Sequence, residues 1–289
     1  GKSRFFAPLG EAAQAEIQER LDGTAKISIP VLLIRGRLSD VVSEENAREF
    51  LEYVPHAEYI DLKDAAHKIA MSKTFDNASS CSSENSVIVQ RYVADKFLHA
   101  LVAEGGYMCN TEEREKLRQY MWPDGTHLNR EIVARPVKFI AENAGLTVPE
   151  DTRFLMVMGE KIGPEDRFSG EKISLVLTVW KWTDFDEMLE RLEKILQFSG
   201  EGHSASIHTE NDERRVKLAQ RINVGRVVCN MPHAHANSGG WNTGLPTTDT
   251  LGCGTWAGNI FSGNINWENF LNYTLLSIPK EEYIPTVEE

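Results

Sequence analysis

Cys81 is the side chain whose setting most invites chemistry, because it lies in the polar run SKTFDNASSCSSENS, residues 72–86. Cysteine is usually buried as a small hydrophobe, whereas this one has serine residues on both sides. A thiolate attacks carbonyl carbon well when its pKa lies near the working pH. If residues 82–84 begin a helix or strand, their free N–H groups lie near the sulfur and favour its ionised form. The residue types allow two interpretations: a nucleophile at the mouth of a site, or an ordinary loop thiol.

The remaining thiols and a histidine pair have weaker patterns. The four cysteines show no paired spacing such as C-x-x-C, so neither a disulfide framework nor a zinc site is expected. Cys229 lies in the apolar stretch RVVCN and is expected in the core, Cys109 follows a Gly-Gly turn, and Cys253 between two glycines is more typical of a site wall. His233 and His235 have no third ligand in view, which favours polar site lining over a metal site.

Apolar strands and amphipathic helices alternate along the chain. Continuous apolar runs such as ISIPVLLIRG (27–36) predict parallel strands buried on both faces. Helix patterns occupy 43–54, 63–73, 111–122 and 184–200. The first has acids in its first turn and ends at Pro55, the third begins at Thr111 with acidic neighbours, and the last ends at a glycine. The order predicts an α/β fold with a mainly parallel sheet and covering helices. From about residue 237 the chain is rich in Gly, Thr and Asn, which predicts a long functional loop.

The totals exclude several classes of protein. The chain has 289 residues, of which 41% are hydrophobic and 26% charged, as in a soluble globular protein. A net charge of −12 argues against a nucleic-acid partner. No apolar run approaches the ~18 residues of a membrane helix, and the first residues lack the pattern of a signal peptide. A reducing, cytoplasmic setting is expected.

From about Leu62 to Pro285 the chain resembles the catalytic half of CoA-acylating aldehyde dehydrogenases. The matching stretches follow one another in the order of the family and are DAAHKIAMSKTFDNASSCSSENS, FSGEKISLVLTVWKWTDFDEML, GHSASIHTEND, GRVVCN and LPTTDTLGCGTWAGNIFSGNINWENFLN. Within the family, the stretches are most similar to sulfoacetaldehyde or acetaldehyde dehydrogenases. The resemblance implies an aldehyde dehydrogenase-like catalytic domain with a mainly parallel sheet.

The resemblance also implies a reaction. Cys81 attacks a small aldehyde to give a thiohemiacetal, hydride passes to NAD or NADP, and coenzyme A takes the acyl group from the resulting thioester. The backbone N–H of Cys81 stabilises the oxyanion. Glu171 falls where the family places an acid that binds the nicotinamide ribose, with a solvated loop carboxylate as the alternative. His203 is expected to pack or hydrogen-bond near the site, and the loop LGCGTWAGN to line it.

The front of the chain fits a different family. The stretch IPVLLIRGRLSDVVSEENAREFLEYVPHAEYIDLKDAAH resembles the C-terminal end of an α/β-hydrolase, with Asp40 and His67 at the positions of the acid and the base. A hydrolase triad also needs a nucleophile before Asp40, and no G-x-S-x-G motif occurs in the chain. We therefore expect a hydrolase-like segment over 1–62 and an aldehyde dehydrogenase-like domain over 63–289.

Three functions remain open at this stage. No glycine-rich turn between a strand and a helix precedes Cys81, so we expect the dinucleotide-binding domain to be missing and dehydrogenase activity to be impaired. The alternatives are ester hydrolysis by Asp40 and His67, or a chimeric fold without catalysis. An apolar face where the missing domain would dock also predicts a homo-oligomer.

Overall fold

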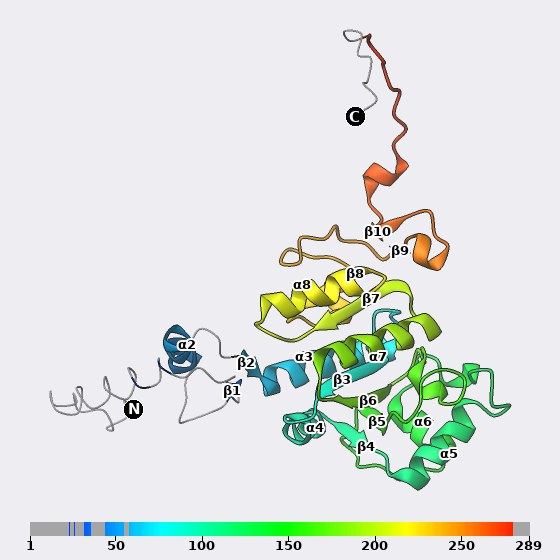
Figure 1. Ribbon diagram of the computed structural model, residues 1–289. Helices are drawn as coiled ribbons and strands as arrows, with labels where there is room; N and C mark the ends of the chain where they lie inside the picture. Colours follow the sequence, from blue (N-terminus) through cyan, green and yellow to red (C-terminus); the bar gives the residue numbers. More distant parts are fainter. Residues whose placement is uncertain (1–22, 24–25, 27–31, 36–43, 55–57, 280–289) are drawn as a thin grey trace, which may run out of the picture.

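A computed structural model describes residues 23, 26, 32–35, 44–54 and 58–279. Its centre is a four-stranded parallel sheet, in which Met156 lies opposite Leu177 in the register of the two middle strands (Figure 1). The strands in spatial order are β3 (Ser86–Gln90), β6 (Val176–Trp182), β5 (Phe154–Met158) and β4 (Gly106–Met108).

Helices cover this sheet and connect its strands. Helix α4 contacts β3 and β4, α7 contacts β6, and α3 packs on α4. The helices around the sheet are α3 (Leu62–Thr74), α4 (Ala94–Ala103), α5 (Thr111–Met121), α6 (Val137–Asn143) and α7 (Phe185–Phe198). No helix among the described residues combines the length and the apolar character that crossing a membrane requires.

Local sequence explains why these helices begin where they do. The Asp61 carboxylate accepts from the N–H groups of Lys63 and Asp64, both at 3.1 Å, and so caps α3. Asn110 caps α5 through a reciprocal capping box with Glu113. These caps satisfy N–H groups that have no partner inside the helix.

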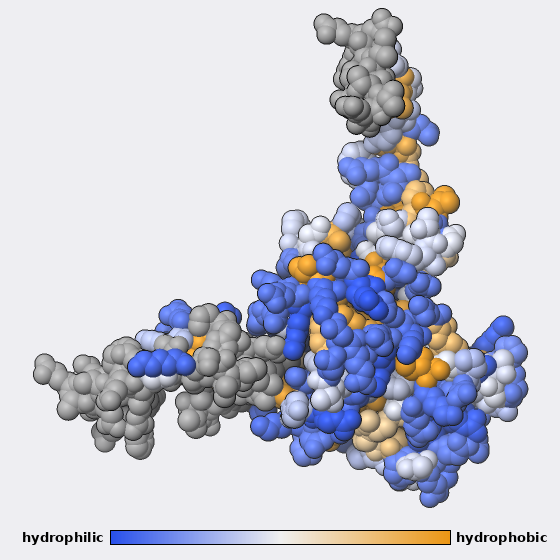
Figure 2. All heavy atoms as spheres, viewed as in Figure 1, coloured by the Kyte–Doolittle hydropathy of each residue, from blue (hydrophilic) through white to orange (hydrophobic). Residues whose placement is uncertain are grey.

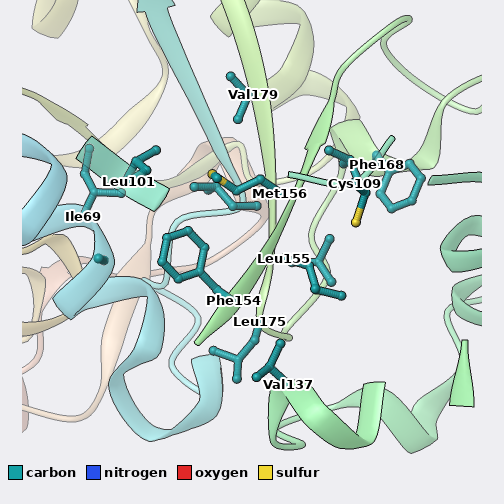
Figure 3. Packing of buried hydrophobic residues seen from close by; sticks show 14 of the residues in the cluster. Ile69, Leu101, Cys109, Val137, Phe154, Leu155, Met156, Phe168, Leu175 and Val179 are labelled. Carbon is teal, nitrogen blue, oxygen red and sulfur yellow. The ribbon is translucent and has the colours of Figure 1, made fainter. Parts of the chain in front are cut away.

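The main core lies between the central sheet and its helices. Phe154, Leu155 and Met156 of β5 are fully buried, as are Val176 and Leu177 of β6. Figure 3 shows part of this cluster, with Ile69 and Leu101 contributed by the neighbouring helices. Strands that are buried on both faces need such uninterrupted apolar runs, which is the pattern that predicted them.

A smaller sheet follows, formed by β7 (Gly202–Ile207) and β8 (Val224–Cys229), which are parallel. In Figure 1 this pair lies between the central sheet and a hairpin. A second apolar cluster joins Trp182 to the inner faces of α7 and α8. The remaining elements of this part are α8 (Asp212–Arg221), α9 (His233–Asn237) and the antiparallel hairpin of β9 (Leu251–Cys253) and β10 (Ser262–Asn264).

The described N-terminal elements are the parallel strands β1 (Leu32–Arg35) and β2 (Glu58–Asp61) with α2 (Glu44–Tyr53). At the other end, residues 271–279 have no regular secondary structure and run away from the body (Figures 1 and 2). Large apolar side chains are exposed in this C-terminal region: Trp267, Phe270, Leu271, Tyr273, Leu275, Leu276 and Ile278.

The predicted α/β architecture with a mainly parallel sheet is confirmed, since only the β9–β10 hairpin among the described pairs is antiparallel. Four features were not predicted: the short strand β4, helices α6 and α9, and the hairpin itself inside the expected loop. Each is three to seven residues long, which is too short for a hydrophobic period to develop.

Candidate active site

A cavity of about 420 Å³ opens between the central sheet and the β7–β8 pair. Apolar side chains of α3, α4 and α7 form much of its wall, including Ile69, Phe97 and Leu192. Polar residues from distant parts of the sequence also line it, among them Cys81, Glu84, Glu171, His203, His233 and Cys253.

An unusual backbone turn carries Cys81. Helix α3 ends at Thr74, and Asp76, Asn77 and Ala78 then have positive φ values of 46°, 51° and 61°. A left-handed conformation costs a residue other than glycine about 1–2 kcal/mol. Ala78 nevertheless has no exposed surface, so packing holds the strained turn in place. The turn reverses the chain and leaves Cys81 exposed at the cavity.

The environment of the Cys81 thiol keeps it protonated. Desolvation raises its pKa above the ordinary value, and the charges of Glu171 and Cys253 raise it further, while the Ser82 side chain and its own backbone N–H lower it. The expected help from free N–H groups is absent at two of the three positions. Ser82 N–H donates to Ser80 Oγ at 3.2 Å and Ser83 N–H to the Ser80 carbonyl at 2.9 Å.

The N–H of Cys81 itself has no hydrogen-bond acceptor among the backbone and side-chain oxygens of the described residues. It remains available as an oxyanion donor.

Two lysines that sequence reasoning missed are buried beside this turn. Lys73 is 1% exposed, and its ammonium donates to the Glu84 carbonyl at 2.7 Å. Lys172 is 0% exposed and donates to the carbonyls of Phe168 and Gly170 at 2.8 and 2.9 Å. Lysine is rarely buried unless it is paired. The two ammonium groups fix the backbone on both sides of the site: the segment after Cys81 and the segment before Glu171.

The Glu84 carboxyl is the anionic neighbour of Lys73. It is 7% exposed, and neither of its oxygens accepts a hydrogen bond of ordinary geometry within the described structure. Burial raises the pKa of Glu84 to about 7 and lowers the pKa of Lys73 to about 7, with mutual attraction opposing both shifts. Burial therefore destabilises the ionised forms of Glu84 and Lys73, and the charge of both groups changes near pH 7.

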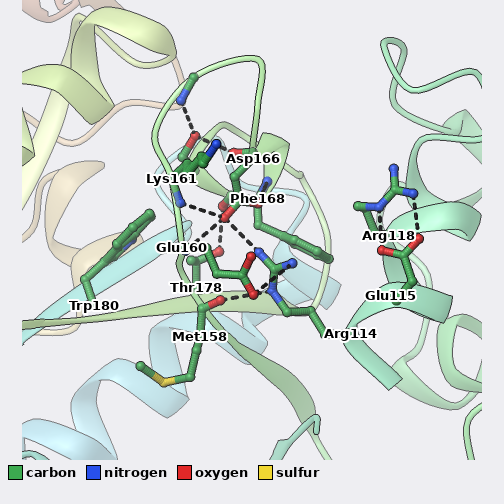
Figure 4. Close-up of polar contacts among 12 residues, drawn as sticks. Arg114, Glu115, Arg118, Met158, Glu160, Lys161, Asp166, Phe168, Thr178 and Trp180 are labelled. Carbon is green, nitrogen blue, oxygen red and sulfur yellow. Dashed lines mark hydrogen bonds and ion pairs between the residues drawn. The ribbon is translucent and has the colours of Figure 1, made fainter. Parts of the chain in front are cut away.

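The loop that carries Glu171 has its own polar anchor, shown in Figure 4. Asp166 accepts from Arg114 Nη2 at 2.7 Å and from the Glu160 N–H at 3.0 Å. Thr178 on β6 donates to the Phe168 carbonyl at 2.6 Å. Through these bonds the central sheet and α5 determine where Glu171 lies.

Ser204 connects the cavity wall to the cysteine turn. Its hydroxyl lies 2.7 Å from His203 Nδ1 and 3.0 Å from His233 Nε2, and it accepts from Asn237 Nδ2 at 3.2 Å. The same Asn237 nitrogen donates to Ser82 Oγ at 2.6 Å, next to Cys81. Burial lowers the pKa of His203 and brings that of His233 to about 3, so both rings are neutral at pH 7.

Most candidates from the sequence meet at this cavity. Cys81, Glu171, His203 and His233 line it, and so does Cys253 of the LGCGTWAGN loop. His235 does not line it and instead contacts the Phe75 ring, with centroids 4.5 Å apart.

Of the two hydrolase candidates, only His67 lies in the described residues. His67 is on α3, where its Nδ1 lies 3.1 Å from a Glu104 oxygen, and it does not line the cavity. Asp40 lies outside the described residues.

The other two thiols are elsewhere. Cys109 is buried in the core as a small hydrophobe, which raises its pKa to about 12. Cys229 is half-buried rather than in the core, contrary to expectation, because burial alternates along β8 and Cys229 lies on the partly exposed face. Across the described ranges, no cluster of three or more His, Cys, Asp or Glu side chains is placed to hold a metal ion.

Comparison with known proteins relates this site to a class of enzyme. The chain has the fold of a probable aldehyde dehydrogenase from Listeria monocytogenes, with a TM-score of 0.71 and 27% identity over 89% of this chain and 59% of that structure. A scan against protein-family models finds none that matches.

Sequence relatives narrow the class. An acylating sulfoacetaldehyde dehydrogenase from Cupriavidus necator is 41% identical over 226 residues, or 78% of this chain and 46% of the relative. An acetylating succinate-semialdehyde dehydrogenase from Clostridium kluyveri is 35% identical over 231 residues, or 79% and 51%. The chain thus spans about half the length of these curated relatives, and its similarity is to CoA-acylating aldehyde dehydrogenases. The comparisons do not support an α/β-hydrolase segment.

Replacement of Glu84 by Gln tests the buried carboxyl. Because the folded pKa of about 7 exceeds the unfolded 4.5, the folded chain binds more protons in this window and loses stability as pH rises through it. Glu84→Gln removes this loss. The unfolding free energy of Glu84→Gln minus that of the parent chain should therefore increase by about 1–2 kcal/mol from pH 5 to pH 6.5.

Urea denaturation at several pH values measures this difference. Glu165→Gln is the control, since Glu165 is an exposed carboxyl whose pKa is lowered by Lys161. A Glu84→Gln difference that stays constant with pH would show that Glu84 is not the titrating group.

Proposed function

We propose that the chain is the cysteine-bearing part of an NAD(P)-dependent, CoA-acylating aldehyde dehydrogenase that converts a small aldehyde to an acyl-CoA. One observation carries the proposal: Cys81 and Glu171 line the same cavity, and the Glu171 charge is close enough to raise the pKa of the Cys81 thiol. A nucleophile facing a carboxylate across a largely apolar cavity fits an aldehyde and a nicotinamide ribose together. The names of the relatives point to the same chemistry.

In the proposed reaction, Cys81 contributes both the attacking sulfur and a hydrogen-bond donor. The Cys81 sulfur attacks the aldehyde carbon, and the Cys81 N–H faces the oxygen that becomes negative. Oxidised nicotinamide, when bound, supplies the hydride acceptor and a positive charge that favours the thiolate. The acyl group then leaves the Cys81 thioester for the thiol of coenzyme A.

Two further groups fit this sequence of steps. Burial raises the pKa of the Glu171 carboxyl, and the charge of Lys172 opposes this shift. The carboxyl has no ion pair within the described structure, so its oxygens are free to accept from ribose hydroxyls. His203 is neutral, and its Nε2 is buried without a hydrogen-bond partner in the described part. It is therefore suited to take the proton of the incoming thiol.

The proposed catalytic domain is residues 63–289, with residues 1–62 as a separate segment. Helix α3 begins immediately after β2, and its buried residues join the main core. This packing supports a boundary close to the start of α3.

Cys81→Ser should abolish turnover. A serine hydroxyl does not replace the thiolate, and the thioester cannot form. Purified chain is assayed for NADH formation with acetaldehyde or sulfoacetaldehyde, coenzyme A and NAD. We expect activity in the parent, retention in the control Cys229→Ser, and a loss of about a thousandfold or more in Cys81→Ser. A folded parent chain without any NADH signal would refute the proposed function for this chain.

Glu171→Gln should weaken cofactor binding and also change the thiol. Loss of charged hydrogen bonds to the ribose should raise KM for NAD about tenfold or more. Because the Glu171 charge raises the pKa of Cys81, its removal should lower that pKa and speed alkylation of Cys81 by iodoacetamide at pH 8. Glu165→Gln, which is remote from the cavity lining, should change neither value. An unaltered KM would remove Glu171 from the cofactor site.

We also propose that the chain forms homo-oligomers through its C-terminal apolar segment, residues 267–278. Phe270, Tyr273, Leu275 and Leu276 are between 71% and 91% exposed, more apolar surface than a soluble monomer ordinarily leaves open in one stretch. Light scattering should give a mass above the monomer, and Leu275→Ser with Leu276→Ser should lower it. A monodisperse monomer at high concentration would contradict the proposal.

A further inference from the structure

Cys81 does not stand alone at the cavity. Cys253, the last residue of β9, lines the same cavity although it is 172 positions away in the chain. The two sulfurs interact electrostatically, since the charge of Cys253 raises the pKa of the Cys81 thiol. Arg226 is beside Cys253 and within electrostatic reach of Cys81.

The backbone of Cys253 is firmly placed. Arg226 on β8 is 5% exposed and donates through Nη1 to the Gly252 carbonyl at 3.0 Å and through Nη2 to the His203 carbonyl at 3.1 Å. The Cys253 N–H donates to Asn259 Oδ1 at 3.1 Å. These bonds hold the hairpin on β7, with the second thiol at the same cavity as Cys81.

Gly202 makes this close approach possible. A Cβ atom at position 202 would lie 2.3 Å from the Cys253 carbonyl oxygen, and the φ of +82° also favours glycine. The cysteine-bearing strand therefore packs directly on the backbone of β7, at the edge of the cavity.

We propose that Cys253 is the resolving thiol for Cys81, so that oxidation by a peroxide joins the two as a disulfide across the cavity. The first step is attack of the Cys81 thiolate on hydrogen peroxide, which breaks the O–O bond and leaves Cys81 sulfenic acid and hydroxide. The Cys253 thiolate then attacks the Cys81 sulfur, and the second hydroxide leaves. Overall, two thiols and one peroxide give one disulfide and two waters.

The disulfide would stop the reaction and preserve the nucleophile. A sulfenic acid without a neighbouring thiol is oxidised further to sulfinic acid, which dithiothreitol does not reverse. The disulfide returns both thiols on reduction. A disulfide requires Cα atoms about 4.4–6.8 Å apart, and formation of the link reports whether residues 81 and 253 reach that separation. Cys109 and Cys229 do not line the cavity and have no part in this exchange.

The experiment treats the full chain with a few equivalents of hydrogen peroxide, because two equivalents are needed to take a lone thiol to sulfinic acid. Mildly alkaline buffer is used, because the raised pKa of the Cys81 thiol leaves little thiolate at neutral pH. We expect an intact mass lower by two hydrogen atoms and a non-reduced peptide that links residues 81 and 253. Dithiothreitol should then restore alkylation of Cys81 almost completely.

Three variants make the result decisive. Cys253→Ser and Cys253→Ala should gain oxygen atoms at Cys81 instead, with little recovery by dithiothreitol, and Cys229→Ser should behave like the parent. Thermal unfolding checks that each variant is folded; if the serine variant is not, the alanine variant carries the comparison. The proposal is overturned if the parent chain forms sulfinic acid as readily as the Cys253 variants, if the link joins other cysteines or other chains, or if Cys81 survives unmodified.

Only the expected loss of turnover on oxidation rests on the proposed function, in which Cys81 is the nucleophile. Disulfide formation itself does not. The readout is thiol chemistry and needs neither NAD nor an aldehyde. A chain that fails the NADH assay can therefore still form the disulfide, and one that passes the assay can still lack it.

Discussion

The geometry of the site depends on burying the ammonium of Lys73 at the end of α3. Removing a charge from water costs several kcal/mol unless the structure returns hydrogen bonds and a counter-charge. Here the Glu84 carbonyl accepts at 2.7 Å, and the Glu84 carboxyl provides the nearby anion. Because both come from the segment after Cys81, the ammonium is satisfied only when that segment is in place. The hydrogen bond from Lys73 to the Glu84 carbonyl thus offsets part of the strain in the left-handed turn between α3 and Cys81.

The same arrangement extends to the opposite side of the cavity. Lys172 is also buried, and it lies within electrostatic reach of Lys73. Burial, and after it the charge of Lys73, lower the pKa of the Lys172 ammonium. It bonds the carbonyls of Phe168 and Gly170, while its own N–H donates to Asn85 Oδ1 at 2.8 Å. Asn85 follows Glu84 directly in the sequence. The segment that carries the nucleophile and the loop that carries Glu171 are therefore parts of one buried polar framework, which limits how far Cys81 and Glu171 can move apart.

The sequence predicted those parts of the fold whose cause is local. β5 and β6 have long apolar runs, and α5 and α7 have caps and periodic apolar faces, so each was found close to its observed bounds. Strand β4 and the β9–β10 hairpin are three-residue strands whose existence depends on partners elsewhere in the fold. No local pattern marks them.

Some residues of the candidate site were predicted from the sequence and others were not, for the same reason. Cys81 and Glu171 were found because motifs around them resemble a family, whereas Lys73 and Lys172 look like ordinary charged residues in the sequence. Their burial arises from the packing of α3, the cysteine turn and the loop before β6, which no single stretch contains. The expectation that free N–H groups would ionise Cys81 was wrong for a related reason. Ser80 folds back on Ser82 and Ser83 and occupies two of those donors.

Together these features keep the Cys81 thiol protonated. Desolvation, the Glu171 carboxylate and the Cys253 sulfur all oppose the Cys81 thiolate. The guanidinium of Arg226 lies nearby, but its Nη atoms are engaged by the backbone of Gly252 and His203. A positive ligand in the cavity would reverse this balance, whereas an empty cavity leaves a protonated thiol that reacts slowly with oxidants and alkylating agents. In the proposed disulfide exchange, the thiol of Cys253 on β9 would protect Cys81 in the interval when Cys81 is ionised and no substrate has arrived.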